Sequence, residues 1–147
     1  MTPTRDAIFE ALFALSDGLA WGAPPRSFLH RSRRVKLWSD LPGQPALCQA
    51  EHDETITQVT GLPPKRTFAA SWLIYHDAGK DPDAAPATET NQILDAIQSL
   101  FPTGDPDHVQ TLGGLVHHAF ISGRVFKDSG DLDGQALIVV PIQMVGP

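Results

Sequence analysis

The segment "QALIVVPIQMV" (residues 135–145) constrains the fold more than any other part of the chain. Its branched and aliphatic residues predict a β-strand that is apolar on both sides. One side carries Ala136, Ile138, Val140, Ile142 and Met144, and the other carries Leu137, Val139 and Val145. In an antiparallel sheet, such a strand is covered on both faces or has one face against another subunit. Pro141 has no backbone N–H, so we expect an edge or a bulge there.

This strand is expected to be the return arm of a C-terminal hairpin. The first arm is predicted from about Leu115 to Phe126, with "KDSGDLDG" as the loop. Two more strands are predicted over "ALCQAEH" (46–52) and over residues 66–76, where alternate positions share one face: Phe68, Ala70, Trp72 and Ile74. The segment "RSRRVKLW" (31–38) also alternates and predicts a half-exposed strand, with Val35 and Leu37 opposite Arg34, Lys36 and Trp38.

Two helices complete the predicted fold. The first runs from about Pro3 to Ser16 with Thr2 as its cap, and the second from about Thr88 to Phe101. Phe9 and Phe13 widen the apolar surface of the first helix, so it either packs on two sides or presents aromatic rings to a partner. The sequence therefore predicts one α+β domain over residues 1–147: a mostly antiparallel sheet with two main helices packed against it and a closing C-terminal hairpin.

Composition narrows the class of protein. The 147 residues carry a formal net charge of -6, which disfavours nonspecific binding of nucleic acid. The first residues predict no signal peptide, and no apolar run reaches membrane-spanning length. Cys48 is the single cysteine, so we expect no internal disulfide, and we expect this residue to be a small buried hydrophobe.

The charges are unevenly distributed along the chain. Arg31, Arg33, Arg34 and Lys36 lie together near Trp38, whereas Asp128, Asp131 and Asp133 lie in the predicted hairpin loop. Basic side chains on a strand commonly provide solubility or protect an edge. The alternative is a contact surface for acidic groups or phosphate, which the neighbouring tryptophan favours.

Motifs for metal binding or catalysis are weak. The adjacent His117 and His118 would point to opposite faces of a strand, so we expect polar packing on a sheet covered on both sides rather than a shared metal. The acidic loop lacks the closing glutamate and flanking helices of an EF-hand, and turn formation explains its aspartates better than calcium. No nucleophile elbow, phosphate-binding loop or dinucleotide fingerprint is present, and we expect neither an enzyme nor a cofactor.

The order of segments resembles a known family. "DAIFEALFAL", "RVKLWSDLPGQPALCQAE", "KRTFAASWLIYHDAG", "NQILDAIQSLF", "TLGGLVHHAFISGRV" and "DLDGQALIVVPIQMV" together look like the small tail-terminator proteins of long-tailed bacteriophages with noncontractile tails. The resemblance covers nearly the whole chain and rests on the order and spacing of these segments. Related neck and tail-completion proteins are built similarly.

The resemblance implies a structural virion protein that is assembled in the host cytoplasm. Such subunits form a homo-hexameric ring on the head-proximal end of the tail tube, end tube growth and bind a neck protein, while DNA passes through the channel without specific binding. No membrane partner is implied. A head-completion connector and, more remotely, a small metal-dependent enzyme are the alternatives.

Two sets of residues are hypothesised to serve such a ring, since each subunit of a cyclic ring uses two different surfaces. The first set would lie at an interface with a neighbouring subunit or the tube, where its cations contact carboxylates: Arg31, Arg33, Arg34, Lys36 and Trp38. The second set would lie near the channel or at the rim, where carboxylates repel DNA phosphates: Asp128, Asp131 and Asp133.

Overall fold

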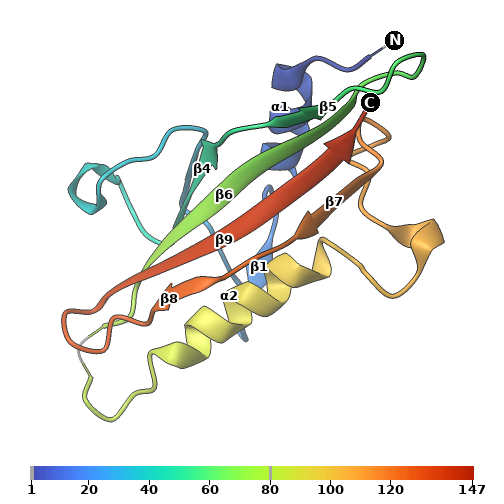
Figure 1. Ribbon diagram of the computed structural model, residues 1–147. Coiled ribbons are helices and arrows are strands. Elements are labelled where there is room, and N and C mark those ends of the chain that lie inside the picture. The colour runs from blue at the N-terminus through green and yellow to red at the C-terminus, as the bar shows by residue number, and fades with distance from the viewer. Residues whose placement is uncertain (1, 80) are drawn as a thin grey trace.

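The computed structural model describes residues 2–79 and 81–147, and within them it has the expected α+β architecture (Figure 1). Seven strands in these residues form one sheet, ordered β3-β4-β6-β9-β7, with β5 also on β6 and β8 also on β9. All pairs are antiparallel except β3 with β4. The sheet strands are β3 (His30–Ser32), β4 (Ala46–Glu51), β5 (Thr55–Thr57), β6 (Lys65–Asp77), β7 (His118–Ile121), β8 (Phe126–Asp128) and β9 (Gln135–Gly146).

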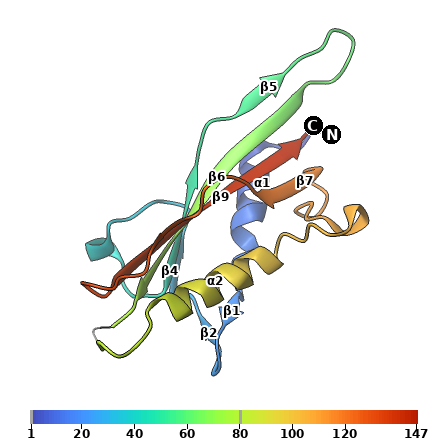
Figure 2. The ribbon, with the colours of Figure 1, turned by 60° about the horizontal axis from the view of Figure 1, so that its bottom comes forward.

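The remaining elements lie around this sheet. The helices are α1 (Arg5–Ala14) and α2 (Ala87–Ser99), with short 3-10 turns at η1 (Trp38–Asp40) and η2 (Pro106–His108). A small separate hairpin joins β1 (Ala20–Trp21) to β2 (Arg26–Ser27). Figure 2 shows both helices on one side of the sheet and the segment that contains η1 on the other.

The pairing of β6 with β9 forms the centre of the sheet. It runs from Arg66 opposite Gly146 to Asp77 opposite Gln135. The predicted inward positions are confirmed, because the even-numbered apolar residues of both strands are buried in the main core: Phe68, Ala70, Trp72, Ile74, Ile138, Val140, Ile142 and Met144. These side chains meet α1 through Ile8 and Leu12, and α2 through Ile93 and Ile97.

The opposite face of the sheet is covered only at one end. There, a second cluster contains Leu41, Ala46, Cys48 and Tyr75, with Trp38 against it. Cys48 is fully buried, as expected, and burial raises the pKa of its thiol. Further along β9, Val139, Pro141 and Val145 are partly exposed and belong to neither cluster. The two-sided apolar character of β9 therefore reflects complete cover on one face and partial cover on the other.

The C-terminal hairpin is present, but its first arm is interrupted. Instead of one strand from Leu115 to Phe126, the structure has β7 and β8 with an irregular segment between them. Pro141 faces that segment, where the N–H of Ser122 donates to its carbonyl at 3.2 Å. The expectation of an edge strand was wrong, because β9 lies between β6 and the β7–β8 arm. The proline is accommodated by a gap in the neighbouring arm.

The first helix begins later than predicted. Its cap is Thr4, whose hydroxyl accepts the N–H of Ala7 at 3.2 Å, and the expected cap at Thr2 was wrong. Thr4 succeeds because it lies three residues before an otherwise unpaired helix N–H. Both aromatic rings are used within the chain: Phe9 packs edge-on against Phe68, and Phe13 lies beneath the guanidinium of Arg31.

The hairpin that joins β5 to β6 projects beyond the rest of the molecule (Figure 2). Residues 55–64 of this hairpin contain no charged side chain. Its exposed apolar side chains are Ile56, Val59 and Leu62, each more than half exposed. Gln58 fixes the turn by donating to the carbonyls of Val59 and Leu62 at 3.2 and 2.9 Å.

Candidate functional site

The basic segment is not the strand that its alternating pattern predicts. Only residues 30–32 form a strand, β3, which pairs in parallel with β4. Beyond Ser32 the chain leaves the sheet and runs to η1, on the side of the sheet opposite the two helices (Figure 2). The hydroxyl of Tyr75 donates to the carbonyl of Lys36 at 2.9 Å, and Trp38 packs edge-on against the same tyrosine ring. Contacts with β6 therefore outweigh the local strand pattern.

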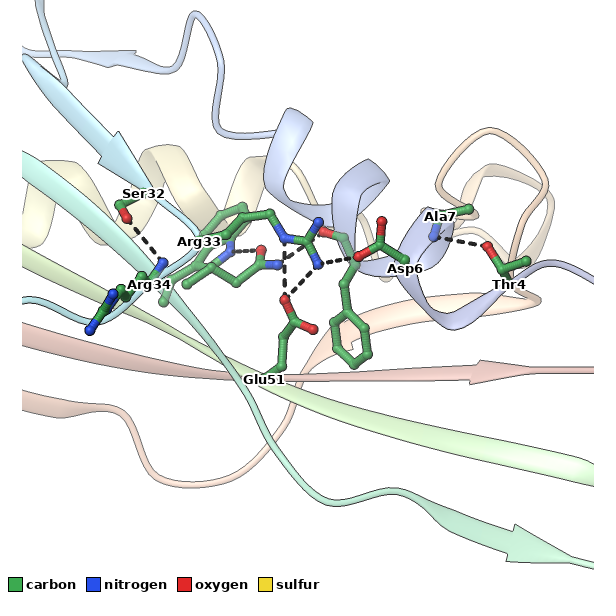
Figure 3. A network of polar contacts seen from close by, with 10 residues as sticks. Thr4, Asp6, Ala7, Ser32, Arg33, Arg34 and Glu51 are labelled. Carbon is green, nitrogen blue, oxygen red and sulfur yellow. Dashed lines mark hydrogen bonds and ion pairs between the residues drawn. The ribbon is translucent and has the colours of Figure 1, made fainter.

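Arg33 pairs with two carboxylates of its own chain at the surface (Figure 3). Its Nη2 donates to Glu51 at 2.7 Å and to Asp6 at 3.0 Å. These interactions, the hydrogen bond to Glu51 foremost, raise the pKa of the guanidinium above its ordinary value. Arg33 thus connects the segment after β3 to α1 and β4. Its carboxylate partners belong to its own chain, whereas the sequence predicted carboxylates of a neighbouring protein.

Arg31 also contacts groups of its own chain. Its guanidinium donates to the hydroxyl of Ser16 and to the carbonyl of Phe13, each at 2.9 Å, and lies 4.4 Å from the centre of the Phe13 ring. Asp17 lies 3.5 Å away. These contacts close the end of α1, so Arg31 serves the fold of one subunit.

Arg34 and Lys36 are the cations left at the surface. Arg34 is exposed and points away from the Arg33 network (Figure 3). Lys36 lies 3.1 Å from Nε2 of His30, whose pKa is lowered by burial and by the lysine charge, so the ammonium donates to a neutral ring. In the part of the chain that the structure describes, neither cation forms a salt bridge.

These two cations border a shallow hollow with both polar and apolar walls. Its volume is about 410 Å³, and it is lined by Arg34, Val35, Lys36, Leu37 and Asp40. Leu37 is 71% exposed and Val35 is 46% exposed. Trp38, expected beside the cations at an interface, is instead half-buried against Tyr75. We call residues 34–37 the basic-apolar segment.

The acidic loop between β8 and β9 is rigidly built. Asp128 accepts the N–H of Gly130 at 3.0 Å, and Asp133 accepts the N–H of Gln135 at 2.9 Å. This confirms the expected turn role for Asp128 and Asp133. Among the described residues, no group of three potential metal-ligating side chains comes together, here or elsewhere. We call residues 128–134 the acidic loop.

Leu132 is the most exposed large apolar residue of this loop. Its side chain is 100% exposed and stands between Asp131 and Asp133. The charge pattern of the sequence predicts a role for the aspartates but gives no role to Leu132, although the leucine lies between two of them in the sequence. The loop also meets the segment after β6, since the N–H of Ala78 donates to the carbonyl of Gly134 at 2.8 Å.

The two adjacent histidines differ in environment. His117 is exposed just before β7, so the packing role expected for it was wrong. His118 lies on the partly covered face of the sheet, with its ring 4.7 Å from that of Phe120. The difference arises because β7 starts at His118 and leaves its neighbour outside the strand.

A buried polar cluster that the sequence analysis did not find connects β6 to α2. His76 is completely buried, its Nε2 lies 2.9 Å from the hydroxyl of Thr90, and its Nδ1 lies 3.3 Å from Glu89. Glu89 also pairs with Arg26 and accepts the indole N–H of Trp21 at 3.2 Å. Burial lowers the pKa of His76 despite the nearby carboxylate.

We expect His76 to make the protein less stable in mild acid. Because its folded pKa is below the unfolded value of about 6.5, the unfolded state binds the proton more readily. Stability is therefore complete above about pH 6.5 and decreases as the pH falls from there through the folded pKa. The urea concentration at the unfolding midpoint should decrease when the pH is lowered from about 7.5 to about 5, and His76→Gln should make this decrease smaller. Exposed His117→Gln is the control, and an equal slope in wild type and His76→Gln would contradict the assignment.

No helix in the described residues has the length and apolar character needed to span a membrane. Neither a scan against protein-family models nor a search of curated proteins gives a match to this chain.

Proposed function

We propose that this protein is a tail terminator, a structural subunit of a hexameric ring that caps the head-proximal end of a phage tail tube, ends its polymerisation and provides the surface for head-tail joining. The proposal starts from the resemblance in segment order and is supported by the kind of surface that the folded chain presents. That surface is suited to contacts with several proteins.

The distribution of exposed apolar side chains carries the proposal. Among the described residues, eight large hydrophobic side chains are at least 45% exposed. They fall in three places: residues 29–37, the β5–β6 hairpin and the β8–β9 hairpin, as Leu29, Val35, Leu37, Ile56, Val59, Leu62, Phe126 and Leu132. Exposed apolar groups gathered in patches are typical of protein-binding surfaces.

Three separate surfaces match the needs of a ring subunit. A subunit in a closed cyclic ring uses two different lateral surfaces, because its contacts are heterologous. A terminator needs at least one further surface that meets the tube. The projecting β5–β6 hairpin is uncharged and apolar, which suits a stable axial contact with a tube subunit or neck protein.

Deletion of the gene from its phage tests the proposal. We expect electron microscopy of lysates to show overlong tubes without heads, because nothing stops polymerisation. Tails of parental length beside unattached heads would contradict a terminator and favour a head-completion connector. Expression of the intact gene from a plasmid should restore parental tail length and serves as the control.

A further inference from the structure

The basic-apolar segment and the acidic loop are chemically complementary. The segment presents Leu37 next to Lys36, with Val35 between Arg34 and Lys36, and the loop presents Leu132 between two carboxylates. Asp40 at the edge of the hollow and Lys127 beside the loop reduce the two opposite charges without cancelling them. Each surface thus combines an exposed leucine with one predominant sign of charge.

We infer that the acidic loop of one subunit docks on the basic-apolar segment of a second copy of this chain, with Leu132 in the hollow beside Leu37. Charge complementarity identifies the occupant, since oppositely charged patches of this kind steer association and fix its register. The contact is heterologous, because the two surfaces are different parts of the chain, and repeated contacts of this type close a ring or extend a filament. It rests on the proposed function in that it assigns the lateral contact of the ring.

Hydrogen bonds and a buried glycine fix the conformation of the acidic loop. Gly134 donates to the carbonyl of Gly130 at 2.9 Å, and its own carbonyl accepts from Ala78, so both ends of the turn are fixed. Gly130 is buried, has a φ of 75°, and leaves no room for a side chain: an added Cβ would lie 3.0 Å from the backbone N of Ala136. A loop already fixed in one conformation loses little conformational freedom when it binds.

The cations of the basic-apolar segment differ in their contacts from the two arginines that precede them. Arg31 and Arg33 are engaged with groups of their own subunit, whereas Arg34 is exposed and Lys36 borders the hollow. The earlier hypothesis of four interface cations is thereby reduced to two. For Asp131 and Asp133, a contact between neighbouring copies takes the place of the predicted position near the channel or at the rim.

Cysteine cross-linking tests the contact directly. Leu37→Cys and Leu132→Cys are combined in one chain, which is produced in cells that assemble the whole tail, and lysates are oxidised with copper phenanthroline. We expect a ladder of covalent oligomers that rises by one subunit at a time, since every chain carries both halves of the contact. Native Cys48 is buried and contributes no background. The matched control pairs Leu132→Cys with Leu62→Cys, an exposed leucine of the β5–β6 hairpin, and should give no ladder.

Charge reversal tests the same contact without cysteines. Arg34→Glu with Lys36→Glu should give overlong tails, and so should Asp131→Lys with Asp133→Lys. All four changes in one chain should restore parental length. The control reverses an exposed cation elsewhere, Arg124→Glu, and should leave tail length unchanged.

The outcomes separate this contact from the proposed function. Covalent dimers without higher oligomers would overturn the head-to-tail arrangement. Absence of cross-links in tails of parental length would overturn the contact. In a phage whose tails become overlong when the gene is deleted, parental tails from either double reversal, or failure of the fourfold variant to recover, would also overturn it. If the gene deletion leaves tail length unchanged while the ladder forms, the terminator function fails and the contact between copies stands.

Discussion

Trp72→Ala is expected to lower the free energy of unfolding by about 3–5 kcal/mol, the range found when a large buried aromatic side chain is removed from a core. Trp72 is completely buried on the helix side of β6, where its ring packs 5.9 Å from that of Phe101. Removal leaves a cavity between the central strand and the end of α2, which the rigid sheet cannot close. Urea unfolding followed by circular dichroism measures the loss.

Trp38→Ala provides the matched control. Trp38 is half-buried on the opposite side of the sheet, so part of its ring is already in water. We expect a loss of about 1–2 kcal/mol from this variant. Equal losses from the two variants would contradict the assignment of the main core to the helix side of the sheet.

Gln49→Leu is expected to have the second largest effect, about 1–3 kcal/mol, because it leaves the buried indole N–H of Trp72 without a partner. The amide of Gln49 donates to the carbonyl of Phe9 at 2.9 Å and accepts the indole N–H of Trp72 at 3.0 Å. Gln49 is completely buried, so water cannot replace either hydrogen bond. This one side chain connects α1, β4 and β6.

Gln110→Leu is the matched control, because it removes two hydrogen bonds from a side chain that is only partly buried. Gln110 also joins two backbone groups, donating to the carbonyl of Leu100 at 2.8 Å and accepting the N–H of Leu112 at 3.0 Å. It is only partly buried, and water can take over its contacts, so we expect a loss of about 1 kcal/mol. If Gln110→Leu is as destabilising as Gln49→Leu, burial is not the cause. The losses from Gln49→Leu and Trp72→Ala should also be less than additive, since both variants remove the same hydrogen bond.

The periodic segments of the fold were predictable from the sequence. Alternation along residues 66–76 and 135–145 identified β6 and β9 and the faces they bury, because those strands pair side by side and share one core. Helical spacing identified α2 for the same reason. Each of these segments has a local pattern that agrees with its final surroundings.

The basic-apolar segment was mispredicted because its surroundings oppose its pattern. Val35 and Leu37 alternate with cations, yet neither apolar side chain is buried. Their conformation is set by Tyr75 and by the partners of Arg33, which lie far away in sequence. The interruption between β7 and β8 was missed for a related reason, since Gly123 and Pro141 reveal it only once the two arms are paired.

The candidate site was only partly visible in the sequence. Clustering of charge pointed to residues 31–38 and 128–133, but it could not separate Arg31 and Arg33, which serve the subunit, from Arg34 and Lys36. That division depends on where Asp6, Glu51 and Ser16 lie after folding. The cluster around His76 has no sequence signal, because its members come from β1, β2, β6 and α2.

The central pairing of β6 with β9 has a consequence for the speed of folding. Every contact in this ladder joins residues on either side of α2 and the whole β7–β8 region. A chain must close that long loop before the ladder can form, and proteins dominated by such nonlocal contacts fold on the scale of milliseconds to seconds. Newly made chains therefore spend that interval with two long apolar strands unpaired, and closure of one loop limits how quickly these strands are covered.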